Sequence, residues 1–380
     1  MKTLHVINSI DKTLGGVVSA ALNIIRMENI LGIDSIIITR KSKNIDPLFY
    51  EYTKIYQFPS SFPKRLYNSV KAIEYTKNKI AGIDIIIFHS VWSMLFYRIA
   101  KVGFKKQIPM ILWAHGSIDP FDLEKKKYYK KLIGPIVIKK MFNRLNYIIC
   151  TTKLEEDIIE KYGSTVKTLV VPLPVLQDSI IGDRKSFRDK YMYSGDDFIL
   201  LFLSRVDYKK GLNLLLPAIG QLSNKLSNIK LIIAGSGSQQ YEDRVHNWIK
   251  QYSLNEHVKF IGFVSQQNRA DAYAGSDCFV LPSMNENFGI AIVEALNSGL
   301  PVMISNNVYI WEKIIEKNGG WVCEYSVQSV VNMIEMIYKN KNDYELKRNN
   351  AKISGEQFLP INLKNNYQML YEKAIAANNI

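Results

Sequence analysis

The sequence predicts an α/β protein with two doubly wound, Rossmann-like units, each built on a parallel sheet. The first observation is a series of short apolar runs that are bounded by turn signals and followed by stretches with helical spacing, as in parallel strands with crossover helices. The second is that this pattern starts again after Val171-Pro172-Leu173-Pro174. The third is the length of 380 residues, which suits two domains of roughly 150–200 residues each.

Six strands are expected in the first half of the chain, at residues 4–8, 35–39, 83–88, 110–114, 147–151 and 168–171. Five more are expected in the second half, at residues 198–204, 230–234, 258–263, 278–282 and 301–305. Residues 362–376 carry apolar side chains at helical spacing, which predicts a final helix. We therefore expect an N-terminal domain at residues 1–175, a C-terminal domain at residues 176–360 and a terminal helix at residues 361–380.

The composition indicates a globular, cytoplasmic protein. Hydrophobic residues make up 47% of the chain, which is too high a share for a disordered one. The cysteines Cys150, Cys278 and Cys323 are widely spaced and odd in number, so neither a disulfide framework nor a metal cluster is predicted. The N-terminal segment leads into Gly15-Gly16 without a cleavage-type signal, and we find no run of about 18 apolar residues that would span a membrane.

Positive charge is concentrated in the first half of the chain. The net charge of +14 divides into +12 for residues 1–179, with 27 Lys and Arg against 15 Asp and Glu, and +2 for residues 180–380. The densest part, residues 125–131 with Lys139, Lys140 and Arg144, mixes cations with aromatic and aliphatic residues, as a helix on anionic lipid does. A nucleic acid would also be attracted, and a solvated helix face explains the charges equally well. We expect an anionic membrane surface as the partner, and no nucleic acid.

Two glutamates eight positions apart lie in the segment that says most about function. Glu286 follows an apolar strand in a loop, and Glu294 lies inside the next helix. The start of that helix exposes backbone amides that favour an anion such as a phosphate, at Asn287, Phe288 and Gly289. A carboxylate beside a diphosphate needs hydrogen-bond donors, and sugar or ribose hydroxyls provide them. The pattern predicts a nucleotide-sugar site, with an ordinary loop carrying two incidental acids as the alternative.

This segment closely resembles the Glu-x-x-x-x-x-x-x-Glu signature of the family 4 retaining glycosyltransferases. The match runs from Glu286 to Leu296, and Gly299-Leu300-Pro301-Val302 follows it, as in family members of the bacterial surface-polysaccharide type. The resemblance covers essentially the whole chain and is most specific over residues 198–305. It implies the GT-B fold, in which two Rossmann-like domains face each other across a ligand-binding cleft and the final helix crosses back to the first domain. It also implies that Ile290 belongs to the donor site, that Glu294 holds the ribose and that Glu286 contacts the transferred sugar.

A pair of cations is expected beside the diphosphate. Arg205 comes just after a strand and Lys210 lies five residues later, where both can neutralise the charge that grows on a diphosphate leaving group. The family's Arg-x-x-x-x-Lys-Gly element matches at Arg205, Lys210 and Gly211, although the adjacent Lys209 is an alternative in register. Taken singly, such cations are more often surface charges. Because fixed cations make a divalent metal unnecessary, and no Asp-x-Asp motif occurs in the sequence, neither a metal nor a cofactor is expected.

Glycine-containing turns are further candidates for the donor site. Ala234-Gly235-Ser236-Gly237 follows a strand and permits close approach of the backbone. The resemblance implies that Gly235 and Gly237 border the nucleotide and that Phe263 lies beside the base. It also implies that Gly15 and Gly16 face the donor's phosphate and sugar, where a plain tight turn is an equally good interpretation. The third glycine of a dinucleotide fingerprint is missing, so NAD binding is not predicted.

His115 is the expected sugar contact of the first half. It follows the strand at residues 110–114 and begins an element similar to the His-Gly-x-x-Asp-Pro of polysaccharide-assembling members of the family, which favours a donor-sugar contact over the structural role usual for a lone histidine. Asp119 is a weaker candidate for the acceptor side, or a cap for a helix that Pro120 begins. His89 and Trp92 could line the acceptor side or belong to the core or rim. No function is predicted for His5, His246 and His257.

Together with the resemblance, these residues predict an enzyme that moves a sugar from a UDP- or GDP-linked donor to a glycan acceptor with retention of configuration. The expected acceptor is a polyprenyl-diphosphate-linked glycan, bound by the N-terminal domain at the inner face of the cytoplasmic membrane, in bacterial O-antigen, capsule or exopolysaccharide synthesis. An epimerase or phosphorylase of the same architecture is one alternative, but an epimerase is expected to lack the glutamate pair. A non-catalytic subunit is another, and it would tolerate loss of Arg205, Lys210 or Glu294, all of which are present.

Overall fold

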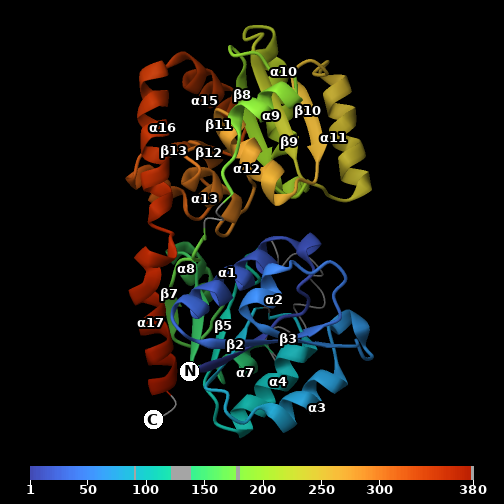
Figure 1. Ribbon diagram of the computed structural model, residues 1–380, viewed down its shortest axis with the longest axis vertical. Coiled ribbons are helices and arrows are strands. Elements are labelled where there is room, and N and C mark those ends of the chain that lie inside the picture. The colour runs from blue at the N-terminus through green and yellow to red at the C-terminus, as the bar shows by residue number, and fades with distance from the viewer. Residues whose placement is uncertain (90, 121–137, 177–179, 378–380) are drawn as a thin grey trace. The chain divides into compact units, whose positions relative to one another are not determined.

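The computed structural model describes residues 1–89, 91–120, 138–176 and 180–377 (Figure 1). The chain divides into two compact units: unit 1 is Met1–Pro174 together with Pro360–Ile380, and unit 2 is Val175–Leu359. Both boundaries lie within one residue of the expected domain boundaries, and the terminal segment belongs to unit 1. The densest part of the expected basic cluster, at residues 125–131, lies outside the described residues.

Unit 1 is built, in the part that the structure describes, on a seven-stranded parallel sheet with the order β3-β2-β1-β4-β5-β6-β7. The strands are β1 Lys2–Val6, β2 Asp34–Arg40, β3 Lys54–Phe58, β4 Ile85–Phe88, β5 Met110–Trp113, β6 Tyr147–Cys150 and β7 Thr168–Val170. The six strands expected in this half are confirmed, and β3 is additional. Because β3 lies at the sheet edge, its side chains are only partly buried and it has no continuous apolar run for sequence analysis to detect.

Helices cover both faces of this sheet, as a doubly wound arrangement requires. They include α1 Gly16–Ile30, α2 Leu48–Tyr52, α3 Val70–Lys79, α4 Met94–Lys105, α7 Lys139–Phe142, α8 Lys153–Lys161 and α17 Pro360–Ala376, with the 3-10 helices η1 Lys12–Leu14 and η2 Lys64–Leu66. One hydrophobic cluster contains Ile36 and Ile38 of β2 together with residues of α3 and α4. A second contains Ile37 together with residues of α1 and α2. This alternation is typical of a strand buried on both sides.

Polar residues fix where several of these helices begin. Ser69, Ser93 and Thr152 precede α3, α4 and α8, and each side-chain oxygen accepts a hydrogen bond from the backbone N–H three residues later. Such caps satisfy one of the backbone donors that a helix start leaves unpaired. Among the described helices, we find none that is both long and apolar enough to cross a membrane.

The terminal helix α17 packs within unit 1. The Tyr367 hydroxyl donates a hydrogen bond to the Pro172 carbonyl oxygen at 3.3 Å, and its ring stacks on Trp113 at a centroid distance of 6.0 Å. The Tyr371 hydroxyl donates to Glu28 Oε1 at 2.5 Å. Figure 1 draws α17 in red beside β7, although the two segments are almost 200 residues apart in the chain. These contacts explain why the last helix belongs to the first unit.

Unit 2 has, among its described residues, a six-stranded parallel sheet with the order β10-β9-β8-β11-β12-β13. Its strands are β8 Phe198–Leu203, β9 Ile229–Ala234, β10 Val258–Gly262, β11 Cys278–Leu281, β12 Val302–Ser305 and β13 Gly320–Cys323. Its helices include α9 Arg184–Lys190, α10 Leu212–Ser223, α11 Gln239–Gln251, α12 Gln266–Gly275, α13 Ile290–Asn297, α14 Trp311–Glu316, α15 Val327–Lys339 and α16 Lys341–Glu356, with the 3-10 helix η4 Tyr208–Lys210. The five expected strands are confirmed. The additional β13 begins at Gly320, directly after Gly319, and a pair of glycines is a signal typical of a turn.

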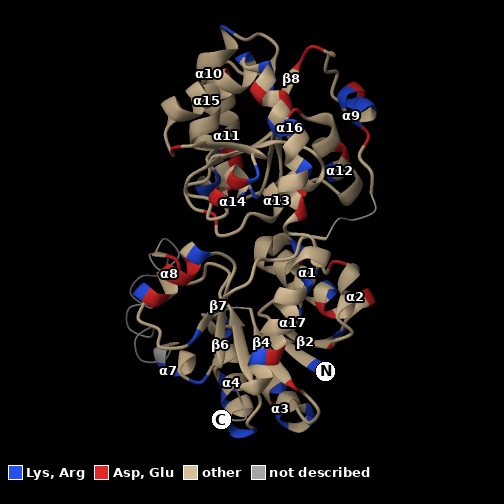
Figure 2. Ribbon diagram, turned by 90° about the vertical axis from the view of Figure 1, so that its left-hand side faces the viewer, with Lys and Arg blue, Asp and Glu red and all other residues tan. Residues whose placement is uncertain are grey.

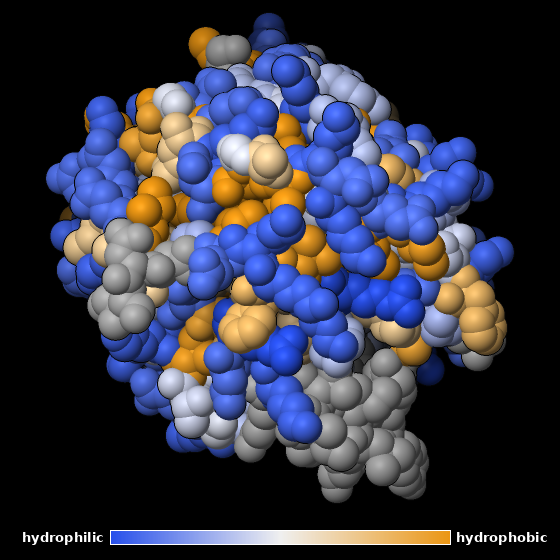
Figure 3. Space-filling view, turned by 90° about the horizontal axis from the view of Figure 1, so that it is seen from below, coloured by the Kyte–Doolittle hydropathy of each residue, from blue (hydrophilic) through white to orange (hydrophobic). Residues whose placement is uncertain are grey.

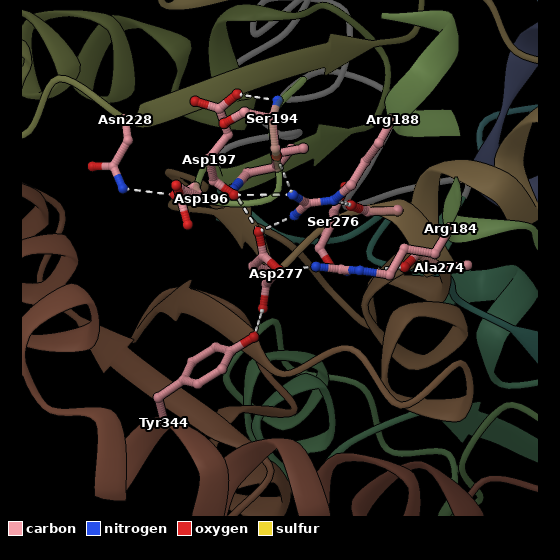
Figure 4. Close-up of polar contacts among 12 residues, drawn as sticks. Arg184, Arg188, Ser194, Asp196, Asp197, Asn228, Ala274, Ser276, Asp277 and Tyr344 are labelled. Atoms are coloured by element: carbon pink, nitrogen blue, oxygen red, sulfur yellow. Dashed lines mark hydrogen bonds and ion pairs between the residues drawn. The ribbon is translucent and has the colours of Figure 1, made fainter. Parts of the chain in front are cut away.

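A buried ion-pair network around Asp277 ties three parts of unit 2 together (Figure 4). Arg184 Nη2 and Arg188 Nη2 each donate to a different Asp277 carboxylate oxygen at 2.7 Å, which attaches α9 to the start of β11. The backbone N–H of Ile199 in β8 also donates to this carboxylate at 2.7 Å. On the other side, the Tyr344 hydroxyl of α16 donates to the Asp277 carbonyl oxygen at 3.2 Å. Asp277 therefore holds together α9, the central strands and α16.

Candidate functional site

Lys210 meets Glu286 at the carboxyl ends of β8 and β11, which are neighbours in the sheet of unit 2. The Lys210 Nζ donates a hydrogen bond to Glu286 Oε2 and forms an ion pair with it, and the two side chains are only 12% and 18% exposed. Lys209 is buried and does not take this position, so Lys210 is the lysine that meets the glutamate. Arg205, two residues after β8, is exposed and supplies a second cation to this part of unit 2.

Tight backbone packing places Lys210 beside Glu286. Gly211 has φ +86°, and a Cβ at this position would lie 2.0 Å from the carbonyl oxygen of Pro282, just after β11. A side chain at residue 211 would therefore force the two loops apart. Glu286 is held from the other side by the loop after β12, because its N–H donates to the Asn307 carbonyl at 3.1 Å and its carbonyl accepts from the Tyr309 N–H at 2.9 Å.

The helix α13 begins next to this ion pair. Its N-cap residue is Gly289, with φ +78° and no side-chain cap hydrogen bond, and Ile290 is the first helical residue. Phe288 is buried against Phe358 at a ring-centroid distance of 5.3 Å, so only its backbone can approach a ligand. Asn287 is half-buried beside it. The positive end of the α13 dipole thus lies in the same loop as Glu286, which favours an anion there.

Glu294 has partners of its own and lines a pocket of about 390 Å³. The Tyr273 hydroxyl donates to Glu294 Oε2 at 2.9 Å, and Arg269 Nη1 lies 3.6 Å from Oε1. Burial, with the nearby Glu294 charge, raises the pKa of Tyr273 well above its ordinary value, so the phenol remains a donor. Lys352 also lines the pocket. A ribose bound here would share the Glu294 carboxylate with Tyr273 and Arg269, and the predicted ribose contact stays a prediction.

Gly235 and Gly237 are required by the neighbouring loop. A Cβ at Gly235 would lie 1.8 Å from the Ser204 carbonyl oxygen, and one at Gly237 would lie 1.9 Å from the Val206 carbonyl oxygen. The close approach that sequence analysis expects at these glycines is therefore made by the chain segment that carries Arg205, which explains both residues without a ligand. Phe263, after β10, is 64% exposed, so its ring is accessible to a base.

Gly15 is the N-cap of α1 and Gly16 is its first residue, and both follow the short helix η1. Gly15 has φ +73° and ψ −137°, a conformation that favours glycine. At Gly16, by contrast, an added Cβ would meet none of the described atoms within 4 Å. The backbone conformation therefore accounts for a glycine at residue 15, whereas no contact with the described residues of unit 1 accounts for a glycine at residue 16.

His115 is the outermost member of a row of hydrogen-bonded histidines in unit 1. Its Nε2 lies 3.1 Å from His89 Nδ1, and His89 Nε2 lies 2.9 Å from His5 Nδ1. His5 Nε2 lies 2.7 Å from Glu28 Oε2. His115 is half-buried and has φ +48°, which is unusual for a residue other than glycine and is found at functional sites. Burial lowers the pKa of His115 to about 3, so its ring is neutral at neutral pH.

His89 belongs to the core, which is one of the positions that sequence analysis leaves open for it. His89 is 1% exposed and hydrogen-bonded on both sides, so it cannot line an acceptor surface. Asp119 is 4% exposed and its N–H closes a turn onto the Gly116 carbonyl at 3.1 Å, and its predicted acceptor contact stays a prediction. Trp92 is half-buried, and its Nε1–H donates to the Ser117 carbonyl at 2.8 Å, which supports the turn that follows His115.

Sequence analysis misses Glu28 and His5. Glu28 occupies an apolar position of α1, three and four residues after the buried Ile25 and Ile24, and such a carboxylate needs buried partners. This is the signal that could have revealed it. His5, in the middle of the buried strand β1, gives the same signal.

Two family descriptions match this chain over most of its length. "Glycosyltransferase Family 4" matches residues 14–175, and "Glycosyl transferases group 1" matches residues 183–354. The chain belongs to the family 4 glycosyltransferases. The first match covers most of unit 1 and the second most of unit 2, in agreement with the resemblance carried by the glutamate pair.

Individual relatives support this assignment. Over 306 residues the chain is 24% identical to the alpha-monoglucosyldiacylglycerol synthase of Streptococcus pneumoniae, covering 76% of this chain and 66% of that protein. It is 20% identical over 304 residues to the O-antigen biosynthesis glycosyltransferase WclY of Escherichia coli, covering 80% and 82%. Several curated relatives are longer, and the chain spans 43% to 66% of their length. The crystal structure of Anabaena HepE in complex with UDP and glucose superimposes with a TM-score of 0.81 at 17% identity, covering 97% of this chain and 99% of that one, which establishes the GT-B fold.

Proposed function

We propose that the chain is a retaining glycosyltransferase that transfers a sugar from a nucleoside diphosphate sugar, UDP- or GDP-linked, to a glycan. The observation that carries this proposal is the Lys210–Glu286 ion pair, which lies beside the start of α13. It joins a cation suited to a diphosphate with a carboxylate suited to sugar hydroxyls. HepE, which shares the fold, is solved with UDP and glucose, and this supports a nucleotide-sugar donor.

In the proposed mechanism, unit 2 stabilises the departing nucleoside diphosphate. Lys210, Arg205 and the backbone amides at the start of α13 neutralise the charge that grows on the phosphate as the glycosyl bond breaks. When the donor binds, Lys210 turns from Glu286 to the phosphate, and the Glu286 carboxylate accepts hydrogen bonds from the sugar instead. The departing phosphate then takes the proton of the incoming hydroxyl on the same face of the sugar, which gives retention. We propose that these fixed cations act without a divalent metal.

Division of labour between the two glutamates is the first testable consequence. Replacing Glu294 by alanine should weaken binding of the free nucleoside diphosphate by about tenfold, since its predicted ribose contact would be lost. Replacing Glu286 should weaken the intact sugar nucleotide preferentially. Calorimetric titration of UDP, UDP-glucose, GDP and GDP-mannose measures both effects, with Glu312→Ala, an exposed glutamate of α14, as the control. Equal losses for both kinds of ligand in both variants would contradict the assignment.

The acceptor that we propose is a polyprenyl-diphosphate-linked glycan in O-antigen, capsule or exopolysaccharide synthesis, reached at the inner face of the cytoplasmic membrane. The E. coli relative named for O-antigen biosynthesis supports this assignment. A cationic surface of unit 1 supports the location. Lys and Arg (blue in Figure 2) occur on α3, α4 and α7, and Figure 3 shows hydrophilic residues interspersed with hydrophobic ones on the side of unit 1 where α3 and α4 lie.

The cations of this surface change the pKa of Tyr97 in α4. A hydrogen bond to Lys101, together with the charges of Lys101, Arg144 and Lys140, lowers the pKa of Tyr97. The Arg144 guanidinium lies 5.0 Å from the ring of Phe104, which is 55% exposed. Cations next to an exposed aromatic ring are the groups that bind an anionic lipid surface.

Membrane docking predicts sedimentation with vesicles that contain phosphatidylglycerol and none with pure phosphatidylcholine, decreasing as salt rises. The double replacement Lys101→Ala and Lys140→Ala should reduce the binding constant by more than tenfold, because each cation near the surface contributes about 1 kcal/mol. Lys313→Ala, an exposed lysine of unit 2, is the control and should leave binding unchanged. Binding that depends on neither lipid charge nor salt concentration would contradict the membrane proposal, but it would not affect the transferase proposal.

A further inference from the structure

The three histidines of unit 1 lie on adjacent strands and rise toward one edge of the sheet. β1, β4 and β5 are neighbours, His5 lies within β1, His89 directly follows β4, and His115 lies two residues after β5. By the register of these strands, each histidine is displaced by two residues from its neighbour, so all three side chains share one face. Their rings are nearly parallel, with interplanar angles of 17° and 10°. The row therefore leads from the buried centre of the sheet to its carboxyl edge, where ligands of such sheets bind.

A buried carboxylate anchors the inner end of this row. Glu28 is 0% exposed, and besides His5 it accepts hydrogen bonds from the hydroxyls of Thr3, Ser35 and Tyr371. Although burial opposes ionisation, the pairing with His5 and the hydrogen bonds from Ser35 and Tyr371 lower the pKa of Glu28 below its ordinary value. An ionised carboxylate can only accept hydrogen bonds, so the Nε2 of His5 must carry a proton.

The proton on His5 Nε2 determines which nitrogen donates in each of the other hydrogen bonds of the row. Burial lowers the pKa of His89 and of His115, so each of these two rings is neutral and carries a single N–H. The order of the row then depends on a His5 ring that is protonated at Nε2 alone. If His5 is protonated at Nε2, its Nδ1 accepts from His89 Nε2–H, and His89 Nδ1 accepts from His115 Nε2–H. The Nδ1 of His115 is then left without a proton. Because His5 and His89 are 0% and 1% exposed, water cannot supply alternative partners that would break this order.

From this geometry we infer that Glu28, His5 and His89 are positioning residues, which fix the tautomer of His115 so that its Nδ1 is an acceptor for a sugar hydroxyl. The inference rests on the proposed function only for the nature of the hydroxyl. The hydrogen-bond order itself does not depend on it. A metal site is not an alternative explanation, because the row is linear and, among the described residues, no group of three His, Cys, Asp or Glu side chains could hold a metal ion.

Nitrogen-15 NMR of the histidine rings tests the hydrogen-bond order without any substrate. Protonated and unprotonated ring nitrogens have very different chemical shifts, and single histidine replacements assign the signals. At pH 8 we expect His5, His89 and His115 all to be protonated at Nε2 only. A wild-type His115 that is protonated at Nδ1, or that populates both tautomers, would overturn the inference.

Replacement of Glu28 by glutamine tests whether the carboxylate sets this order. With the amide oxygen in the place of Oε1, where Tyr371 donates, the glutamine would present its NH2 to His5 Nε2 and to the hydroxyl oxygens of Thr3 and Ser35. This reverses the row and leaves His115 protonated at Nδ1. The same logic applies to the asparagine variant of a serine-protease triad, where the wrong tautomer costs activity in an intact geometry. We expect the His115 tautomer to invert and kcat to fall more than tenfold, with KM for the donor less affected.

Tyr371→Phe is the matched control, because it removes a hydrogen bond from Glu28 Oε1 while His5 uses Oε2. It should lower stability and leave the His115 tautomer unchanged. If Glu28→Gln does not fold, His89→Phe, which keeps a ring in the row, replaces it and should leave His115 with mixed tautomers. An active wild-type enzyme whose Glu28→Gln variant keeps both its tautomer and its kcat contradicts the inference alone. If the row is ordered as described but no sugar nucleotide is turned over, the proposed function fails and the positioning stands.

Discussion

Replacement of Lys210 by alanine should reduce turnover of the sugar nucleotide by about 100-fold, the effect of losing one preorganised group that stabilises a developing negative charge. The reason is structural. Gly211 packs the η4 segment against Pro282, so the backbone at Lys210 is held at the ends of β8 and β11, and only the side chain turns from Glu286 when the donor binds. A flexible lysine elsewhere could not replace it. Steady-state release of the nucleoside diphosphate measures the effect, and kcat should fall more than KM rises.

The control for this variant is Lys225→Ala, which removes an exposed lysine of the same unit and should have no effect on turnover. Circular dichroism should show that Lys210→Ala is folded, because only the ion pair with Glu286 is removed from a partly exposed loop. Turnover at the wild-type rate by Lys210→Ala would contradict the assignment of the diphosphate site to this loop.

Replacement of Asp277 by alanine should lower the free energy of unfolding by about 3–5 kcal/mol, since it leaves the charge of the buried Arg188 without its partner. This is a large part of the 5–15 kcal/mol that is typical of a folded protein. The loss also removes one hydrogen bond of Arg184 and the partner of the Ile199 N–H, so the attachment of α9 to the sheet should weaken (Figure 4). Urea unfolding followed by circular dichroism measures the change.

Glu335→Ala provides the comparison for the stability prediction. Glu335 pairs with Lys339 one helical turn later, but that lysine side chain is 64% exposed, so removal of the pair should change stability by no more than about 0.5 kcal/mol. If Asp277→Ala unfolds at the same urea concentration as Glu335→Ala, the Asp277 network does not hold unit 2 together.

The strands found by sequence analysis are those with continuous apolar runs, because central strands of a parallel sheet are buried on both faces. The two that it misses, β3 and β13, are both edge strands, although the other two edge strands, β7 and β10, are found. Only one neighbour pairs with an edge strand, so β3 keeps partly exposed side chains, and β13 can begin with a glycine. Their identity depends on the position that the rest of the sheet leaves for them, which no local pattern reveals.

The candidate site also has a part that the sequence predicts and a part that it does not. Sequence analysis can predict the donor-site residues of unit 2 because each of them lies shortly after a strand or in the helix that follows. These residues are Arg205, Lys210, Glu286 and Glu294. The row from Glu28 to His115 cannot, since its members come from α1, β1 and the loops after β4 and β5. Only the sheet order β1-β4-β5 makes three separate histidines neighbours. For the same reason sequence analysis leaves open whether His89 lines an acceptor surface or belongs to the core, whereas the structure buries it between two other rings.

The most direct test of the account is a transfer assay with a panel of UDP- and GDP-sugars, polyprenyl-diphosphate-linked glycans as acceptors, and EDTA throughout. We expect one donor to release its nucleoside diphosphate in step with the appearance of a glycan extended by one sugar, with the anomeric configuration retained. Conversion of a sugar nucleotide into its epimer without release of nucleoside diphosphate, or binding of a donor without any turnover, would contradict the proposal that this chain is a glycosyltransferase whose fixed cations stabilise the leaving group.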